Sequence, residues 1–143
     1  MNARSLKHKE LTDKIIKGFY EVYNELGYGF LESVYERALN IVFESYGLQV
    51  ERQKDIAVHF RTMVIGEYRA DLVVEDTVIV EIKAGRALAP EHEAQVMNYL
   101  RATNIEIGFL VNFGQKPEFK RFVYDNERKS ISGNLCKSVA EKL

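Results

Sequence analysis

Two charged residues interrupt an apolar segment at residues 78–83, whose sequence is Val-Ile-Val-Glu-Ile-Lys. A run of β-branched and apolar residues is typical of a buried central strand. Because side chains alternate between the two faces of a strand, Glu81 and Lys83 project from the same face. A buried charge needs a partner charge or a metal ion, so this pair predicts a functional site.

A third charged residue, Asp71, lies on the preceding predicted strand, before the polar turn at residues 75–77. A hairpin centred on Asp76 places Asp71 opposite Glu81, and directly opposed residues have Cβ atoms about 4.5–5.5 Å apart. Two carboxylates at that separation repel each other unless a cation joins them. The spacing therefore predicts that Asp71 and Glu81 share one metal ion.

Oxygen ligands of this kind suit Mg²⁺, which proteins hold through one or two carboxylates and water. Mn²⁺ is an alternative, and the backbone carbonyl of Ile82 can add an oxygen ligand. The ammonium group of Lys83 would lie beside the metal, where it can orient a water molecule or neutralise phosphate charge. The competing interpretation is a solvated hairpin on which Asp71, Glu81 and Lys83 form ordinary surface ion pairs. The residue types by themselves leave both interpretations open.

The composition is that of one ordinary globular domain. Of the 143 residues, 46% are hydrophobic and 29% are charged, a mixture that supports a core and argues against disorder. We expect a single domain over residues 1–143, in which the polar tail at residues 126–143 is assigned to no element. The net charge of −1 and the pI of about 6.3 count against a pure nucleic-acid-binding module, which is usually basic.

The sequence also bears on the cellular compartment. No apolar run approaches the roughly 20 residues of a membrane span, and residues 1–10 lack the apolar stretch of a secretory signal. The single cysteine, Cys136, allows no disulfide within the chain. A cytoplasmic protein with no membrane partner is therefore expected.

Hydrophobic periodicity divides the chain into helices and strands. Apolar residues recur at helical spacing before Gly27 and again before Gly47, and beyond Gly47 they alternate with polar residues at strand spacing. The expected helices cover residues 6–26, 31–46 and 90–103, and the expected strands cover residues 56–60, 68–74, 78–83, 107–111 and, at an edge, 119–124. The order ααβββαβ(β) predicts an α/β fold with a mixed β-sheet flanked by helices.

Four separated motifs follow one another between residues 11 and 121. They are Gly29-Phe30-Leu31-Glu32-Ser33-Val34-Tyr35, which reads G-x-x-E-x-x-Y, then Gly66-Glu67-Tyr68-Arg69-Ala70-Asp71, Glu81-Ile82-Lys83, and His92-Glu93-Ala94-Gln95-Val96-Met97-Asn98-Tyr99-Leu100. Together they resemble the GxxExxY protein family, which is placed in the PD-(D/E)xK nuclease superfamily. The resemblance implies a restriction-endonuclease-like core. Ala70 stands where the superfamily name has proline, and Tyr35 is expected to pack against the core.

The resemblance implies roles for individual residues. It assigns Asp71 and Glu81 to metal binding and Lys83 to catalysis. Glu32 resembles the superfamily's helical acidic residue, which reaches the metal directly or through water. Gln95 resembles the glutamine on the helix after the ExK strand. Glu32 could equally be a residue that only starts a helix, and Gln95 an exposed helical glutamine.

The leading hypothesis is a Mg²⁺-dependent nuclease that hydrolyses phosphodiester bonds of DNA or RNA. One alternative is a nucleic-acid-binding or assembly module that keeps the fold without cleaving. Another is a structural homo-oligomer with Tyr28, Phe30 and the helical tyrosines in its interface.

Overall fold

The computed structural model of the chain describes residues 3–129, with side chains from residue 8 onward. Its elements are α1 (Ala3–Leu26), α2 (Glu32–Ser45), β1 (Val50–Phe60), β2 (Met63–Val74), β3 (Val78–Lys83), α3 (Pro90–Ala102), β4 (Ile107–Phe113) and β5 (Pro117–Val123). The strands form one sheet in the order β1-β2-β3-β4-β5. Neighbours pair antiparallel except β3 and β4, which are parallel. The predicted mixed sheet and the predicted element order are confirmed.

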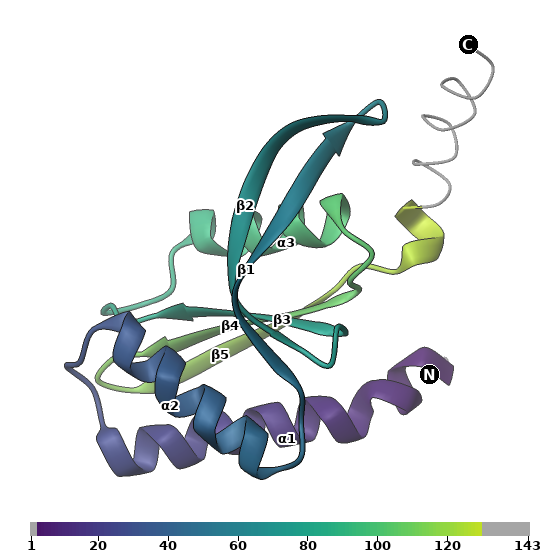
Figure 1. Cartoon of the computed structure of the whole chain (residues 1–143). Coiled ribbons are helices and arrows are strands. Elements are labelled where there is room, and N and C mark those ends of the chain that lie inside the picture. Colours follow the sequence, from purple (N-terminus) through teal and green to yellow (C-terminus); the bar gives the residue numbers. More distant parts are fainter. Residues whose placement is uncertain (1–2, 130–143) are drawn as a thin grey trace.

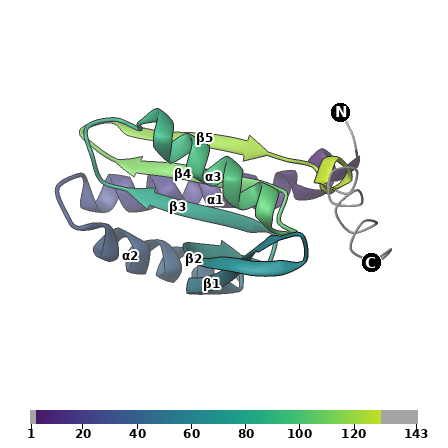
Figure 2. The same cartoon turned by 90° about the horizontal axis from the view of Figure 1, so that it is seen from above.

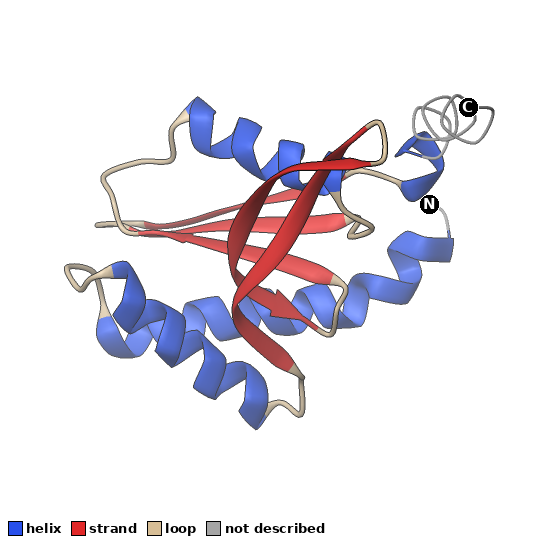
Figure 3. Cartoon of the chain, turned by 45° about the horizontal axis from the view of Figure 1, so that its top comes forward, coloured by secondary structure: helices blue, strands red, loops and turns tan. Residues whose placement is uncertain are grey.

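Helices cover both faces of the sheet (Figures 1 and 3). Beneath α1 and α2 lies the larger apolar cluster, which includes Phe19, Leu39, Val80 and Phe113. A smaller cluster beneath α3 consists of Ala70, Val73, Ile79 and Leu100, with half-buried residues around it. Because β3 alternates between the two clusters, Glu81 and Lys83 follow Ile79 onto the face that α3 covers.

The hairpin of β1 and β2 starts in the sheet and extends beyond it (Figure 1). Its tip turns at Arg61 and Thr62, whose φ angles of 50° and 68° are left-handed. Pairing is also interrupted near the sheet, where Gln53 has a φ of 51°. The regular pairs on either side of Gln53 join Arg52 to Leu72 and Lys54 to Ala70, so the interruption lies opposite Asp71. The strand expected at residues 56–60 begins six residues earlier in the structure, at residue 50.

The connection from α1 to α2 is built around two glycines and a tyrosine. Gly27 and Gly29 have φ angles of 68° and 108°, a region that glycine adopts without steric cost. The Tyr35 hydroxyl donates to the carbonyl oxygen of Gly27 at 2.7 Å and accepts from the N–H of Phe30 at 3.2 Å. The Tyr35 ring stacks on Phe113, with centroids 4.0 Å apart. Tyr35 packs in the core as predicted, and it also fixes the turn from which α2 starts.

The predicted polar tail begins with a helical turn at residues 126–129, and the rest of that tail, with Cys136, lies outside the described residues. Within residues 3–129, no helix combines the length and the apolar character that a membrane crossing requires.

Candidate metal centre

β2 and β3 pair in the register that the sequence predicted, centred on Asp76. The paired residues are Leu72 with Val80, Val73 with Ile79, and Val74 with Val78. The turn between the strands, at residues 75–77, uses left-handed φ angles of 54° at Glu75 and 50° at Asp76. Regular pairing stops one step before Asp71 and Glu81, so the two strands separate at the candidate site.

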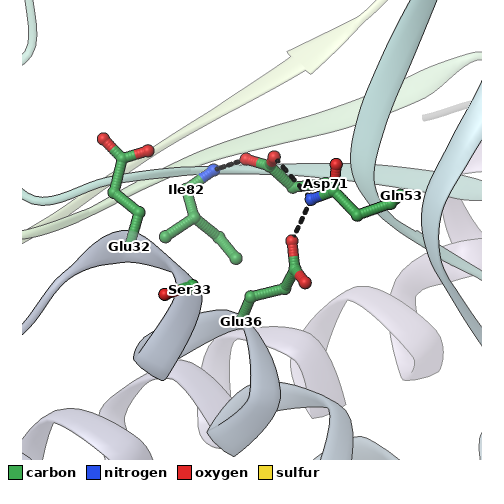
Figure 4. Close-up of a pocket in the computed structure, with 6 residues that line it drawn as sticks. All are labelled: Glu32, Ser33, Glu36, Gln53, Asp71 and Ile82. Carbon is green, nitrogen blue, oxygen red and sulfur yellow. Dashed lines mark hydrogen bonds between the residues drawn. The ribbon is translucent and has the colours of Figure 1, made fainter.

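Asp71 bridges the point at which the strands separate. Its Oδ2 accepts a hydrogen bond of 2.8 Å from the backbone N–H of Ile82. Its Oδ1 lies 3.4 Å from the side-chain amide nitrogen of Gln53 (Figure 4). The Asp71 side chain thus replaces the backbone of β2 as the partner of β3, and this contact holds its carboxylate beside the end of β3.

An open pocket of about 300 Å³ lies between α2 and this part of the sheet (Figure 4). Its lining residues are Glu32, Ser33, Glu36, Gln53, Asp71 and Ile82. Glu32 and Glu36 are one helical turn apart on α2, and Asp71 faces them from the sheet. The structure therefore places Glu32 in the same pocket as Asp71 and Ile82.

Glu36 and Gln53 are pocket residues that the sequence analysis missed. Glu36 is 6% exposed, and its carboxylate accepts hydrogen bonds from the Gln53 amide and from Arg52 Nε, the latter at 3.2 Å. Gln53 therefore contacts both Glu36 and Asp71. The spacing of four residues between Glu32 and Glu36 could have predicted Glu36 from the sequence. No sequence pattern predicted the left-handed backbone at Gln53.

Glu81 is buried on the α3 face, with 6% of its surface exposed. Its Oε1 is inaccessible to solvent and has no hydrogen-bond partner among the described residues. Burial, and secondly the charge of Asp71 beside it, raise the pKa of Glu81 to about 9. Its neighbours include Tyr68 and Tyr99, whose rings stack on each other with centroids 3.2 Å apart. Burial first, and then the charge of Glu81, raise the pKa values of both phenols.

Lys83 and Gln95 lie on the same face as Glu81. Lys83 is half-buried, and its charge lowers the pKa of Glu81 by less than burial and Asp71 raise it. Gln95 is exposed on α3 and its side chain contacts the Tyr99 hydroxyl. It does not line the pocket beside α2. Within the described part of the chain, Asp71, Glu81 and Lys83 form no salt bridge, so the interpretation as ordinary surface ion pairs does not match the structure.

The segment after Lys83 is held by a buried asparagine that the sequence analysis also missed. Asn112 is fully buried, and its amide both accepts from the N–H of Gly85 and donates to its carbonyl oxygen, each at 3.0 Å. At the start of α3, His92 Nδ1 accepts from the N–H of Ala89 at 3.2 Å. His92 therefore caps the helix.

The donor atoms suit a hard divalent cation. The Asp71 carboxylate, the unpartnered Glu81 oxygen and the Ile82 carbonyl belong to neighbouring residues, and Glu32 lies across the pocket. A cation between Asp71 and Glu81 would offset the repulsion that raises the Glu81 pKa. No group of three or more His, Cys, Asp or Glu side chains within residues 8–129 is arranged to hold an ion by itself. Any cation held here would therefore take further ligands from water, as hard divalent cations do.

A family model of the PD-(D/E)XK nuclease superfamily matches residues 9–122. The chain therefore belongs to this superfamily, whose members generally use divalent metal ions. The GxxExxY subfamily stays a prediction. No curated protein matches the chain.

Two solved structures match the chain. The crystal structure of SSO0001 matches with a TM-score of 0.51 and 15% identity, over 95% of this chain and 70% of that one. The alkaline exonuclease LHK-Exo from Laribacter hongkongensis has a TM-score of 0.47 and 14% identity, over 77% of this chain and 65% of the exonuclease. At 15% identity the likeness to SSO0001 concerns the fold alone.

Proposed function

We propose that this chain is a divalent-metal-dependent nuclease that hydrolyses phosphodiester bonds of DNA or RNA, with Mg²⁺ as the natural metal. The observation that carries the proposal is the buried Glu81 carboxylate, which has an oxygen without a partner and lies beside Asp71. A buried carboxylate oxygen without a partner is costly, and in a member of this nuclease superfamily a bound cation is the partner that its chemistry calls for.

Each residue of the site has a role that follows from its position. A divalent ion bound here would stabilise charge on the phosphate and lower the pKa of a bound water. Asp71 and Glu81 would hold the ion, and the hydrogen bond from the Ile82 N–H keeps the Asp71 carboxylate beside the end of β3. Lys83, on the same face as Glu81, orients the attacking water or neutralises phosphate charge. Glu32, on α2, lines the same pocket as Asp71 and adds a further carboxylate to the site.

Gln95 lies on the face of the sheet that α3 covers, the same face as Glu81 and opposite to α2. Its side chain contacts the Tyr99 hydroxyl, and the charges of Glu81 and Asp71 both contribute to the raised pKa of Tyr99. In this proposal Gln95 and Tyr99 hold the Glu81 side chain in position.

One observation favours a second candidate, a nucleic-acid-binding module that keeps the fold without cleaving. The side chains described here contain no preformed cluster of three metal-binding groups. This candidate predicts binding of nucleic acid with no metal-dependent cleavage.

Single-turnover cleavage of labelled DNA and RNA, in Mg²⁺ or Mn²⁺ and in EDTA, separates the two candidates. The informative variants are Glu81→Gln and Lys83→Met, which keep much of each side chain's shape and remove its charge. Both should cleave at least ~10²-fold more slowly, the scale of losing one preorganised electrostatic contact. Calorimetric titration should distinguish them, because Glu81→Gln weakens metal binding whereas Lys83→Met leaves it unchanged or strengthens it.

Matched controls are available on the same chain. Lys14→Met removes another half-buried lysine, and Glu118→Gln removes a half-buried strand glutamate; both should cleave at the wild-type rate. If Glu81→Gln and Lys83→Met also cleave at that rate, the activity does not belong to this site. The non-cleaving module then becomes the better interpretation.

A further inference from the structure

The start of α2 presents large apolar side chains to solvent. They are Tyr28 at 57% exposed, Phe30 at 47%, Leu31 at 75% and Val34 at 38%. Within this stretch lie Glu32 and Ser33, which line the pocket of the candidate metal centre. We call this exposed apolar surface the rim, because its residues adjoin in sequence two residues that line the pocket.

This rim is rigid. The left-handed glycines Gly27 and Gly29 set the turn, and the Tyr35 hydroxyl bonds to backbone groups of Gly27 and Phe30. The Phe30 ring meets the Tyr35 ring edge-on, at 6.0 Å between centroids and an angle of 82°. Because the Phe30 ring is held in this contact before any ligand arrives, little conformational entropy is lost when it binds one.

Two cationic side chains, Arg86 and Lys116, lie at the end of the sheet where α1 connects to α2. The parallel strands β3 and β4 both end there, so the β3–α3 and β4–β5 connections lie beside the α1–α2 connection (Figures 1 and 2). Contacts join them, because the Tyr23 hydroxyl donates to the carbonyl of Gly114 at 2.8 Å and Gly114 packs against Gly85. Arg86 and Lys116 are exposed on these connections and form no salt bridge to another described residue.

We infer that this end of the sheet is a binding platform for single-stranded nucleic acid. Tyr28 and Phe30 stack on unpaired bases, and Arg86 and Lys116 pair with phosphates. Exposed aromatic rings combined with cations that follow the backbone are the features by which proteins bind single strands without sequence preference. In a duplex the base faces already stack on one another, so the platform selects single strands or frayed ends. The inference rests on the proposed nuclease function, because the pocket at its rim would receive the scissile phosphate.

A second copy of the chain is the competing occupant of the apolar surface. It would cover the rings but would bring the same cations to its own side of the contact. Nucleic acid satisfies both features, since it offers π faces to the rings and negative charge to Arg86 and Lys116. Charge complementarity therefore favours nucleic acid.

Fluorescence anisotropy in EDTA tests the platform without cleavage. The probes are a labelled mixed-sequence DNA strand, its RNA counterpart and the DNA duplex of the same sequence. Wild type should bind at least one of the single strands more tightly than the duplex, and the two strands report whether DNA or RNA is preferred. Tyr28→Leu and Phe30→Leu, which keep apolar bulk without an aromatic face, should each weaken that binding about tenfold. Arg86→Gln and Lys116→Gln should each reduce the salt dependence of binding by about one phosphate contact.

Phe60→Leu is the matched control, because Phe60 is 55% exposed at the far end of the β1–β2 hairpin. It should bind like wild type. Equal binding of single strands and duplex, or no response to either leucine variant, would overturn the platform. So would sedimentation data in which the leucine variants dissociate a dimer without changing oligonucleotide binding. If the wild type binds single strands in this way but shows no metal-dependent cleavage, the nuclease function is contradicted and the platform is still supported, because the binding assay contains no metal.

Discussion

The Asp71 side chain on β2 is hydrogen-bonded to the main chain of Ile82 on β3, with 2.8 Å between Oδ2 and N. Regular pairing of these strands ends at Leu72 and Val80, so this contact closes the sheet where the backbones separate. Asp71 thus serves both the pairing of the strands and the candidate metal centre. A useful variant must preserve the hydrogen bond to Ile82 while removing the charge of the carboxylate.

Asp71→Asn meets that requirement, because asparagine keeps an oxygen that can accept from the Ile82 N–H. Mg²⁺ or Mn²⁺ should raise the melting temperature of the wild type, since a ligand bound only by the folded state stabilises it. Asp71→Asn should lose most of this rise. Thermal unfolding with and without the metal measures both. Asp76→Asn, at the exposed β2–β3 turn, is the control and should keep the rise. Equal rises in Asp71→Asn and the wild type would place the metal elsewhere.

The raised pKa of Glu81 predicts how stability depends on pH in EDTA. The folded-state pKa is about 9, against 4.5 for an unperturbed glutamate. Between these values the folded state keeps a proton that the unfolded chain releases, so the free energy of unfolding falls as pH rises. Each unit of pH across that interval corresponds to at most about 1.4 kcal/mol.

Glu81→Gln should remove this dependence and, in EDTA near pH 8, should be more stable than the wild type. Urea unfolding across the interval measures the effect, and Glu118→Gln should follow the wild-type profile. Parallel profiles for Glu81→Gln and the wild type would show that Glu81 ionises freely in the folded protein.

Tyr35→Phe tests the turn that starts α2. Phenylalanine keeps the stacking on Phe113 but removes the hydroxyl that bonds to Gly27 and Phe30. We expect a loss of about 1–3 kcal/mol in the free energy of unfolding, the cost of leaving such partners unpaired. Chemical denaturation measures it. Tyr20→Phe is the control, because the Tyr20 hydroxyl has no hydrogen bond to the residues described, and it should leave stability unchanged.

Gly114→Ala tests the close contact between the β4–β5 turn and the segment after Lys83. A Cβ at Gly114 would lie 2.5 Å from the Gly85 carbonyl oxygen, so backbone must move. We expect a destabilisation of about 1–3 kcal/mol, the usual cost of overpacking, together with slower cleavage if Lys83 shifts. Gly66→Ala, where a Cβ would meet nothing within 4 Å, should change neither quantity.

The sequence by itself determined the order of the elements and the register of the central hairpin. Periodicity is local, so the helical spacing before Gly27 and the apolar run at residues 78–83 were enough to place those elements. The length of the turn at residues 75–77 then fixed the register, since a hairpin's pairing follows from its loop. The proximity of Asp71 and Glu81 followed from that register without any knowledge of the rest of the fold.

Only the tertiary structure decided how the site is assembled. The strands separate at Asp71, so its carboxylate bonds to the Ile82 N–H and also lines the pocket beside α2, whereas Glu81 is buried on the α3 face. Glu36 and Asn112 carry the supporting contacts, from elements distant in sequence. Their partners are set by how helices and strands pack, which involves contacts between residues far apart in the chain and leaves no local periodicity to detect.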